Sequence, residues 1–432
     1  MLRCFILSIG LCASGWAQAA WEIRVWHTMQ GAAATQLGEL ARRFNEAQKQ
    51  YRVVLSHRPA GLQAAALAPR KAGPRPHILQ VGDTGTAEIL AHWSAIVPLW
   101  QLMADTGQPY AQDYFPAVAA TLSDAEGRLL ALPFNASTPV LYYNRDAFRN
   151  ARLDPARPPQ TWYEMPDALG ALVEAGELCA FTTARPSWVL LENMSAWHDQ
   201  EFATHQNGVG GDAARLAFNT RLMVRWISML SSWSKSGYFS YSGRGIEAEA
   251  RFAAGECALL TSSSASYAEL RRRAKFDLAV AQLPYYDDFE DAPQNTLFGG
   301  AAFWVLAGKP KHDYRGVAEF LAYLAWPEIQ AEWAAVTGDL PLTQSAYEAA
   351  RRHGLFAAMP MYEIAVQQLR KVPTRDSQGI RLARLQTIRD IIDEELELVW
   401  KGQKAPLDAL NTAVQRGNAL LEQAAARTHG GR

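Results

Sequence analysis

Serine and threonine hydroxyls, paired glycines and one arginine are the residues of this 432-residue chain that could together bind an anion. Ser262-Ser263-Ser264 follows a predicted strand, Gly299-Gly300 lets the backbone approach a ligand, and Asn135–Thr138 lies between two prolines. Arg389 adds a guanidinium. Small phosphorylated molecules are typically held by backbone N–H groups at glycine turns, by hydroxyls and by the arginine fork. This set therefore indicates a binding site for a phosphorylated small molecule.

Each of these segments also has a structural interpretation that is at least as common when it is taken alone. The serines could cap the helix expected from Ser266, and the glycines could form a turn. Arg389 could pair with Asp393, one helical turn further along. The sequence leaves these alternatives open.

The chain lacks the motifs on which common catalytic and metal sites depend. It contains no H-E-x-x-H, G-x-S-x-G or G-x-x-x-x-G-K-[ST] sequence and no paired C-x-x-C. The nine histidines are scattered, and the spacing of His198 and His205 fits no familiar metal site. We therefore predict no catalytic residue, no metal site and no cofactor, and we expect a binding protein rather than an enzyme.

The elements that must position the candidate residues follow an α/β pattern. Residues 21–26 and 51–55 are predicted strands, with apolar residues at helical spacing between them. Residues 77–81 form a further predicted strand, which places Asp83 at a strand's carboxyl end, where open α/β sheets bind ligands. The apolar run 129–144, interrupted by Pro133 and Pro139, is expected to leave one sheet and enter another.

A second crossing is predicted near residues 295–306, and the chain is mainly helical from Tyr314 onward. With 432 residues, the chain exceeds the ~250–300 at which one core stops growing, so two lobes are expected. The 42 Lys and Arg residues balance 43 Asp and Glu residues, for a formal net charge of -1. This balance offers no general attraction to nucleic acid, which is not an expected partner.

Residues 1–20 have the features of an export signal: one positive charge, an apolar run and an A-x-A end. The run is shorter than the ~20 residues that a membrane-spanning helix needs. We expect this signal peptide to be cleaved, and the mature chain to work in the periplasm. A lipoprotein anchor at Cys12 is less expected, because the bulky Leu11 precedes it.

Two cysteines, Cys179 and Cys257, remain after the leader is removed. In an oxidising compartment they could form one disulfide, or they could be two separate buried thiols. A disulfide requires Cα atoms about 4.4–6.8 Å apart, which the sequence alone does not reveal.

Segments throughout the chain resemble the family of sn-glycerol-3-phosphate-binding proteins of Ugp-type ABC importers. They are WHTMQG (26–31), LARRFNE (40–46), ILQV (78–81), PFNASTPVLYYN (133–144), LENMSAW (191–197), FSYSGR (239–244), GECALLTSS (255–263), DAPQN (291–295), FGGAAFWV (298–305), TGDLPLT (337–343) and IRDIIDEELELVWKG (388–402).

This resemblance implies the two-lobed, maltose-binding-protein-like fold of cluster 1 periplasmic binding proteins. It places one lobe in residues 21–135 and 300–338, and the other in residues 136–299 and 339–432. It further implies a monomer that closes on its ligand by bending at two hinge crossings. The partners would be a membrane permease and a cytoplasmic ATPase.

Four positions that match the family's ligand contacts are carried over by the resemblance: Ser137, Ser263, Gly300 and Arg389. At four other positions the chain departs from the family pattern. A family Tyr falls in a shortened region, where Ala60, Gly61 or Leu62 takes its place. A family Glu is Asp83, a family Trp aligns with Arg185, and a family Tyr is Asp339.

These departures bear on which ligand is bound. Asp339 near a phosphate would add like-charge repulsion, which Arg185 could offset by pairing with Asp339 or by contacting the phosphate. Alternatively, Arg185 could point to solvent. The loss of the Tyr and Trp side chains leaves room in the part of the site that would hold the glycerol group. A glycerophosphodiester such as glycerophosphocholine is therefore a second candidate ligand.

Two further functions compete with this interpretation. A sugar or oligosaccharide receptor of the same fold would fit the altered aromatic and acidic positions, although not the four retained ones. An exported hydrolase could use Asp83 and Asp339 as a carboxylate pair, but no nucleophile or metal set accompanies them.

Overall fold

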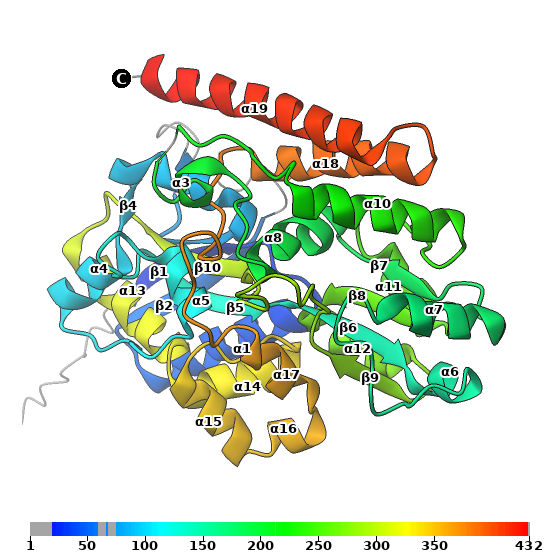
Figure 1. Ribbon diagram of the computed structural model, residues 1–432. Helices are drawn as coiled ribbons and strands as arrows, with labels where there is room; N and C mark the ends of the chain where they lie inside the picture. The colour runs from blue at the N-terminus through cyan, green and yellow to red at the C-terminus, as the bar shows by residue number, and fades with distance from the viewer. Residues whose placement is uncertain (1–19, 59–65, 68–74, 212, 431–432) are drawn as a thin grey trace, which may run out of the picture.

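The computed structural model describes residues 20–58, 66–67, 75–211 and 213–430. Its backbone forms two β-sheets that lie next to each other, with helices packed around both (Figure 1). None of the helices in these residues has the length and hydropathy of a membrane-spanning segment. The predicted α/β architecture is therefore confirmed.

The first sheet has six strands, in the order β2-β1-β3-β10-β4, with β5 paired to β10. Its first three strands are parallel, and β10 runs antiparallel to its neighbours. Ile23 and Val25 of β1 are fully buried in the same core cluster as the apolar face of α1 (Gly31–Ala47), which confirms the predicted strand-helix-strand opening. The strands are β1 (Trp21–His27), β2 (Tyr51–His57), β3 (Ile78–Gly82), β4 (Ile96–Val97), β5 (Leu132–Ser137) and β10 (Gly299–Leu306).

The second sheet has four strands, in the order β7-β8-β6-β9. They are β6 (Pro139–Asn144), β7 (Phe181–Thr183), β8 (Leu259–Ser263) and β9 (Leu278–Ala281). A disulfide joins Cys179 to Cys257, just before the parallel strands β7 and β8, with the two Cα atoms 4.5 Å apart. Of the two alternatives that the sequence left open, the structure shows the bridge.

The chain passes between the sheets where the sequence predicted. Only Thr138 separates β5 of the first sheet from β6 of the second, and β10 brings the chain back. The hydroxyls of Thr138 and Thr296 share a hydrogen bond, and the backbone N–H of Thr138 donates to the Ser264 hydroxyl at 3.1 Å. Both crossings are thereby fastened to each other and to the end of β8.

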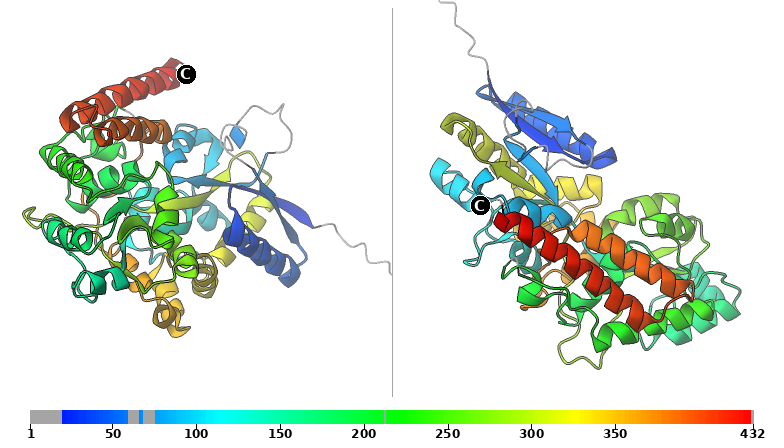
Figure 2. Two further views of the ribbon diagram at one scale, coloured as in Figure 1. Left: turned by 90° about the vertical axis from the view of Figure 1, so that its right-hand side faces the viewer. Right: turned by 90° about the horizontal axis from the view of Figure 1, so that it is seen from above.

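Helices make up most of the remaining chain. The long C-terminal helices α18 (Leu385–Trp400) and α19 (Pro406–Gly430) pack side by side and against α10 (Arg221–Lys235) (Figure 2). The others are α3 (Thr86–Leu90), α4 (Leu99–Thr106), α5 (Pro116–Leu122), α6 (Arg145–Asn150), α7 (Met165–Glu174), α8 (Asn193–Trp197), α9 (Thr204–Asn207), α11 (Glu247–Ala253), α12 (Tyr267–Arg273), α13 (Lys311–Leu324), α14 (Pro327–Thr337), α15 (Gln344–Arg352), α16 (Leu355–Ala358) and α17 (Met361–Gln367), with a π-helix, η4 (Ser187–Glu192), before α8 and single 3₁₀ turns η2 (Asp83–Gly85), η3 (Trp93–Ala95) and η5 (Ser264–Ser266).

Two clusters of buried side chains form the core. Buried residues from Leu340 to Leu369 pack in the same cluster as the first sheet, whereas those from Ile380 to Leu421 pack with the second. The predicted lobe boundaries, 21–135 with 300–338 and 136–299 with 339–432, stay a prediction.

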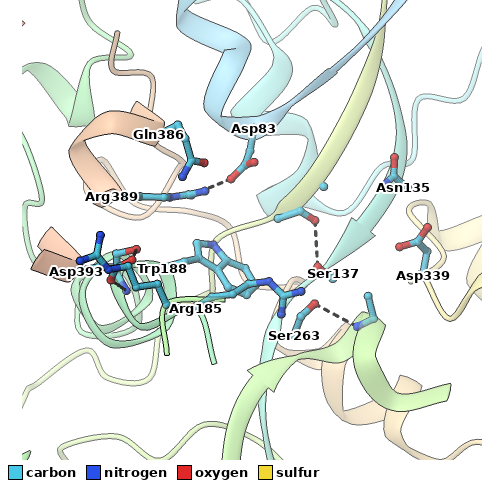
Figure 3. Close-up of a pocket in the computed structure, with 15 residues that line it drawn as sticks. Asp83, Asn135, Ser137, Arg185, Trp188, Ser263, Asp339, Gln386, Arg389 and Asp393 are labelled. Carbon is cyan, nitrogen blue, oxygen red and sulfur yellow. Dashed lines mark hydrogen bonds and ion pairs between the residues drawn. The ribbon is translucent and has the colours of Figure 1, made fainter. Parts of the chain in front are cut away.

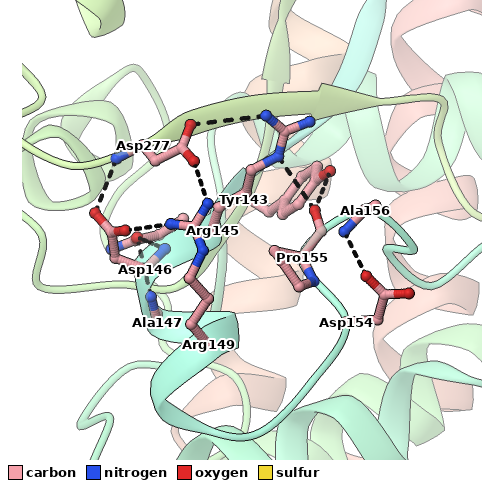
Figure 4. A network of polar contacts seen from close by, with 10 residues as sticks. Tyr143, Arg145, Asp146, Ala147, Arg149, Asp154, Pro155, Ala156 and Asp277 are labelled. Carbon is pink, nitrogen blue, oxygen red and sulfur yellow. Dashed lines mark hydrogen bonds and ion pairs between the residues drawn. The ribbon is translucent and has the colours of Figure 1, made fainter.

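A polar network at the far end of the second sheet fastens α6 to β9 (Figure 4). Asn144 caps α6 by accepting hydrogen bonds from the backbone of Asp146 and Ala147. Arg149 pairs with Asp277 at 2.7 Å, and the Nε of Arg145 donates to the carbonyl of Pro155 at 3.1 Å. The network anchors the surface helix without contributing to the pocket described next.

Candidate ligand-binding site

A polar pocket of about 400 Å³ lies where the two sheets meet (Figure 3). The first sheet and its connections contribute β5, β10, η2 and the turn after α14. The second sheet's side contributes β8, η4, η5 and α18. The residues that line the pocket are Asp83, Asn135, Ser137, Arg185, Ser187, Trp188, Arg244, Ser263, Ala265, Gly299, Gly300, Asp339, Gln386, Arg389 and Asp393.

The pocket brings together all the predicted site residues that the structure describes. They are Ser137, Ser263, Gly300 and Arg389, and the three departures Asp83, Arg185 and Asp339. The fourth departure, at Gly61 with Ala60 and Leu62 as alternatives, lies outside the described residues. Positions up to 306 residues apart in sequence therefore converge on one cavity.

Gly300 is required by the close approach of β10 to β5. Its φ is +150°, and a Cβ atom there would lie 2.0 Å from the carbonyl oxygen of Asn135. A Cβ atom at the neighbouring Gly299 would lie 2.7 Å from the indole of Trp188. These two glycines let the backbone itself form part of the pocket wall.

The two candidate serines face the pocket from different sheets. Ser137 ends β5 and donates a long hydrogen bond of 3.4 Å to the carbonyl of Gly299. Ser263 ends β8, and its hydroxyl oxygen accepts a hydrogen bond from the backbone of Ala265 at 3.2 Å, which caps η5. The Ser263 hydroxyl still has its own hydrogen to donate, so a capping role and a ligand contact are compatible.

Arg389 is held by two carboxylates. Its Nε and Nη2 donate to Glu192 at 2.6 and 2.8 Å, and Nη2 also donates to Asp83 at 2.8 Å. Burial disfavours the charged guanidinium, but the two carboxylates outweigh it and raise the pKa of Arg389. Burial also raises the pKa of Glu192, which is 1% exposed, and Arg389 counteracts this only in part.

The alternative pairing of Arg389 with Asp393 is not found. Asp393 instead accepts hydrogen bonds from the backbone and hydroxyl of Ser187, at 3.0 and 3.4 Å. Burial raises the pKa of Asp393 to about 7. The carboxyl of Asp393 therefore changes charge near neutral pH.

Arg185 neither pairs with Asp339 nor points away from the site. Its Nη1 donates to Glu249 at 2.9 Å and to the Ser262 hydroxyl at 3.4 Å. Figure 3 shows its side chain reaching across the pocket toward Ser263. The structure therefore shows a pairing with Glu249 that the sequence did not predict, and a contact of Arg185 with the ligand stays a prediction.

Asp339 is buried and hydrogen-bonded to α14, the helix that directly precedes it. Its Oδ2 accepts a hydrogen bond from the indole of Trp333 at 2.8 Å. Burial raises the pKa of Asp339 to about 6, with the bonds from Trp333 and Thr337 opposing the change. Asp339 is therefore neutral below about pH 6 and charged above it, so the expected repulsion toward an anion depends on pH.

Sequence reasoning missed Trp188, Ser187, Arg244 and Gln386. Ser187 and Trp188 lie in η4, whose π-helical register differs from the 3.6-residue spacing by which helix faces are predicted. Arg244 is held by Glu397 at 2.7 Å, and this arginine lowers the pKa of Glu397 to about 2. The segment FSYSGR, which contains Arg244, carries part of the family resemblance, but no local pattern marks Arg244 as a pocket residue.

Among the described residues, no group of three or more His, Cys, Asp or Glu side chains could hold a metal ion. The polar side chains in the pocket instead supply hydroxyls, two amides, three guanidiniums and three carboxyls. Such a set can bind a polar ligand that carries negative charge and hydroxyl groups.

Solved structures of binding proteins have backbones similar to that of this chain. UgpB from Mycobacterium tuberculosis in complex with glycerophosphocholine matches with a TM-score of 0.75 and 22% identity, over 94% of this chain and 99% of that one. The sugar-binding protein MalE from Xanthomonas citri matches with a TM-score of 0.74 and 19% identity, over 93% and 98%. These matches confirm the predicted maltose-binding-protein-like fold.

Relatives found by sequence share a higher identity with this chain than these solved structures do. The sn-glycerol-3-phosphate-binding periplasmic protein UgpB of Yersinia enterocolitica is 43% identical over 425 residues, covering 97% of this chain and 96% of that protein. The protein of the same name from Salmonella paratyphi A is 44% identical over 422 residues, covering 96% of each chain. The family model for bacterial extracellular solute-binding proteins matches residues 39–358. This chain belongs to the family of bacterial extracellular solute-binding proteins.

Proposed function

We propose that this protein is the solute-binding component of an ABC importer and that it binds sn-glycerol-3-phosphate or a related glycerophosphodiester. The observation that carries the proposal is the meeting of Ser137, Ser263, Gly300 and Arg389 in one pocket between the sheets. The names of the sequence relatives support the same ligand.

The pocket supplies separate groups for the two parts of such a ligand. Guanidiniums and the serine hydroxyls suit a phosphate, since charge-assisted hydrogen bonds to phosphate are strong. The buried Oδ1 of Asn135 has no hydrogen-bond partner among the described residues and is free to accept from a glycerol hydroxyl. Asp83 is a further acceptor for hydroxyls.

A glycerophosphodiester is the second form of the ligand that the pocket accommodates. The cavity of about 400 Å³ falls within the ~300–1,000 Å³ that holds a drug-sized ligand, which exceeds a glycerol phosphate in size. Trp188 and the carboxyls of Asp339 and Asp393 line the same space and could face a cationic head group.

In this proposal the ligand is carried and not altered. The two lobes close over it by bending at the crossings around Thr138 and Gly299, and the closed form is recognised by a membrane permease with a cytoplasmic ATPase. The protein acts as a monomer in the periplasm after cleavage of residues 1–20. A hydrolase that pairs Asp83 with Asp339 is not supported, because both carboxylates are engaged elsewhere, by Arg389 and Trp333.

Titration calorimetry of the mature chain with sn-glycerol-3-phosphate, glycerophosphocholine and maltose tests the ligand. We expect binding of one or both phospho compounds and no heat with maltose, whereas binding of maltose alone would favour the sugar receptor. Phosphorus NMR after prolonged incubation tests whether the protein alters the ligand covalently. We expect the ligand's spectrum to stay unchanged.

A further inference from the structure

The three arginines of the pocket differ in which edge of the guanidinium is free. The edge formed by Nε and Nη2 presents two parallel N–H groups that match two oxygens of a carboxylate or a phosphate. In Arg389 that edge is occupied by Glu192, and in Arg244 it is occupied by Glu397. An anionic ligand would have to displace a carboxylate to use either edge.

Arg185 has its Nε–Nη2 edge free of hydrogen bonds to any described residue. Only Nη1 is engaged, by Glu249 and the Ser262 hydroxyl. The side chain is 39% exposed, compared with 13% for Arg389. Arg185 therefore combines an open fork with access to a ligand that enters the pocket.

The protein holds Arg185 in place from both ends. Its backbone adopts a φ of +48°, a left-handed conformation that costs about 1 kcal/mol or more for a residue other than glycine. The backbone N–H donates to the carbonyl of Gly245 at 2.9 Å, and Pro186 follows directly. At the other end, one oxygen of Glu249 accepts from Arg185, Ser262 and Ser266, all within 2.9 Å.

The carboxylates around Arg185 also compensate its positive charge less than those around Arg389 do, so Arg185 is the better partner for an anion. Arg389 faces both Glu192 and Asp83, so those three groups carry a net negative charge. Arg185 faces the single carboxylate of Glu249, whose charge is shared with two serine hydroxyls. The cation that remains least compensated in the pocket is therefore Arg185.

We propose that Arg185 binds the phosphate group of the ligand through its Nε–Nη2 edge, together with the hydroxyl of Ser263. Arg185 lies two residues beyond the end of β7, and Ser263 ends the adjacent strand β8, in which Thr261 pairs with Thr183. The side chains of Arg185 and Ser263 both line the pocket. This inference rests on the proposed function only in requiring a phosphate-bearing ligand. It assigns to Arg185 a contact that the resemblance did not carry over.

Binding of sn-glycerol-3-phosphate to Arg185→Ala and Arg185→Lys tests the inference. Loss of a charge-assisted bidentate contact should weaken the affinity of Arg185→Ala by about tenfold to a hundredfold. Arg185→Lys keeps the charge but not the fork, and we expect it to lie between the wild type and Arg185→Ala. Arg145→Ala removes an equally exposed arginine from the network of Figure 4 and should bind as the wild type does.

The outcomes separate this inference from the proposed function. If the wild type binds the phosphate ligand and Arg185→Ala binds it equally well, the inference is wrong and the proposed function stands. Wild-type affinity in Arg185→Lys would overturn the bidentate contact. If the wild type itself binds only maltose, the proposed function fails. Thermal unfolding of each variant shows whether an affinity loss reflects a lost contact or a lost fold, and Arg185→Lys supplies the test if Arg185→Ala does not fold.

Discussion

At the scale of single residues, the pocket is a balanced set of charges: three arginines and three aspartates line it. Each of the three arginines pairs with a glutamate, and two of the aspartates have a pKa raised by burial. The net field that a ligand meets therefore depends on a few pairings. Changing one partner of a pair should change both stability and affinity, and the two effects can be separated.

Arg389→Ala tests the buried pair. Removal of the arginine leaves Glu192 buried without its partner, so we expect a loss of about 3 kcal/mol in the free energy of unfolding, measured with urea. Affinity for sn-glycerol-3-phosphate should be lost as well. The double variant Arg389→Ala with Glu192→Gln should recover most of the stability without recovering binding. Wild-type affinity in the double variant would show that Arg389 makes no contribution to the ligand.

Asp339→Asn tests the effect of a carboxyl whose pKa is about 6. Below that pH Asp339 is neutral, so wild type and variant should bind sn-glycerol-3-phosphate equally at pH 5. At pH 8 the wild type carries the extra negative charge, and the variant should bind several-fold more tightly. The ratio of the two affinities cancels the ligand's own titration and that of Asp393. A ratio that does not change between pH 5 and pH 8 would contradict this prediction.

The raised pKa of Asp339 also determines how the stability of the fold depends on pH. The folded-state pKa of Asp339 lies above the ordinary value of 3.8, so the folded chain binds more protons than the unfolded chain between about pH 4 and pH 6. Asp339 therefore destabilises the fold increasingly as pH rises through that window. Asp339→Asn should remove this part of the pH dependence.

At the scale of elements, the close contact of β10 with β5 is the feature that shapes the pocket wall. Gly300→Ala would place a Cβ 2.0 Å from the carbonyl oxygen of Asn135, at a φ of +150°. We expect a loss of stability of at least about 3 kcal/mol and loss of binding. Gly308→Ala is the matched control: φ is +81°, nothing lies within 4 Å, and the cost should be about 1 kcal/mol. Equal costs in urea unfolding would contradict the steric argument.

The disulfide that links the starts of β7 and β8 should act on stability alone. Cys179 and Cys257 are 78 residues apart, so chain-entropy arguments give the bridge a contribution of about 4 kcal/mol. The double variant to serine should unfold at lower urea concentration, while its ligand affinity stays unchanged because neither residue lines the pocket. A large loss of affinity in a folded double variant would contradict this expectation.

Local sequence patterns predicted the elements but not all the contacts between them. The strand-helix-strand opening, the crossing at Thr138 and the C-terminal helices follow from apolar spacing and prolines, which are local signals. The π-helix that carries Trp188 was missed, because its register has no distinctive apolar spacing. The partners of Arg389 lie 197 and 306 positions away, and no local pattern connects them.

At the scale of the whole molecule, the site exists only because two sheets meet. Neither sheet holds a complete set of ligand groups: Ser137, Gly300 and Asp83 come from one side, and Ser263, Arg185 and Arg389 from the other. The formal net charge of -1 gives no long-range attraction to an anion, so recognition must arise within the pocket itself. The resemblance predicted which residues converge, and the structure adds which guanidinium is free to act.

The most direct test of this account is a crystal structure of the mature protein loaded with sn-glycerol-3-phosphate. We predict that the phosphate lies between the two sheets, within hydrogen-bond distance of the Ser263 hydroxyl and an arginine guanidinium, with the glycerol intact beside it. A phosphate bound elsewhere, or one in this pocket that touches no arginine, would contradict the account.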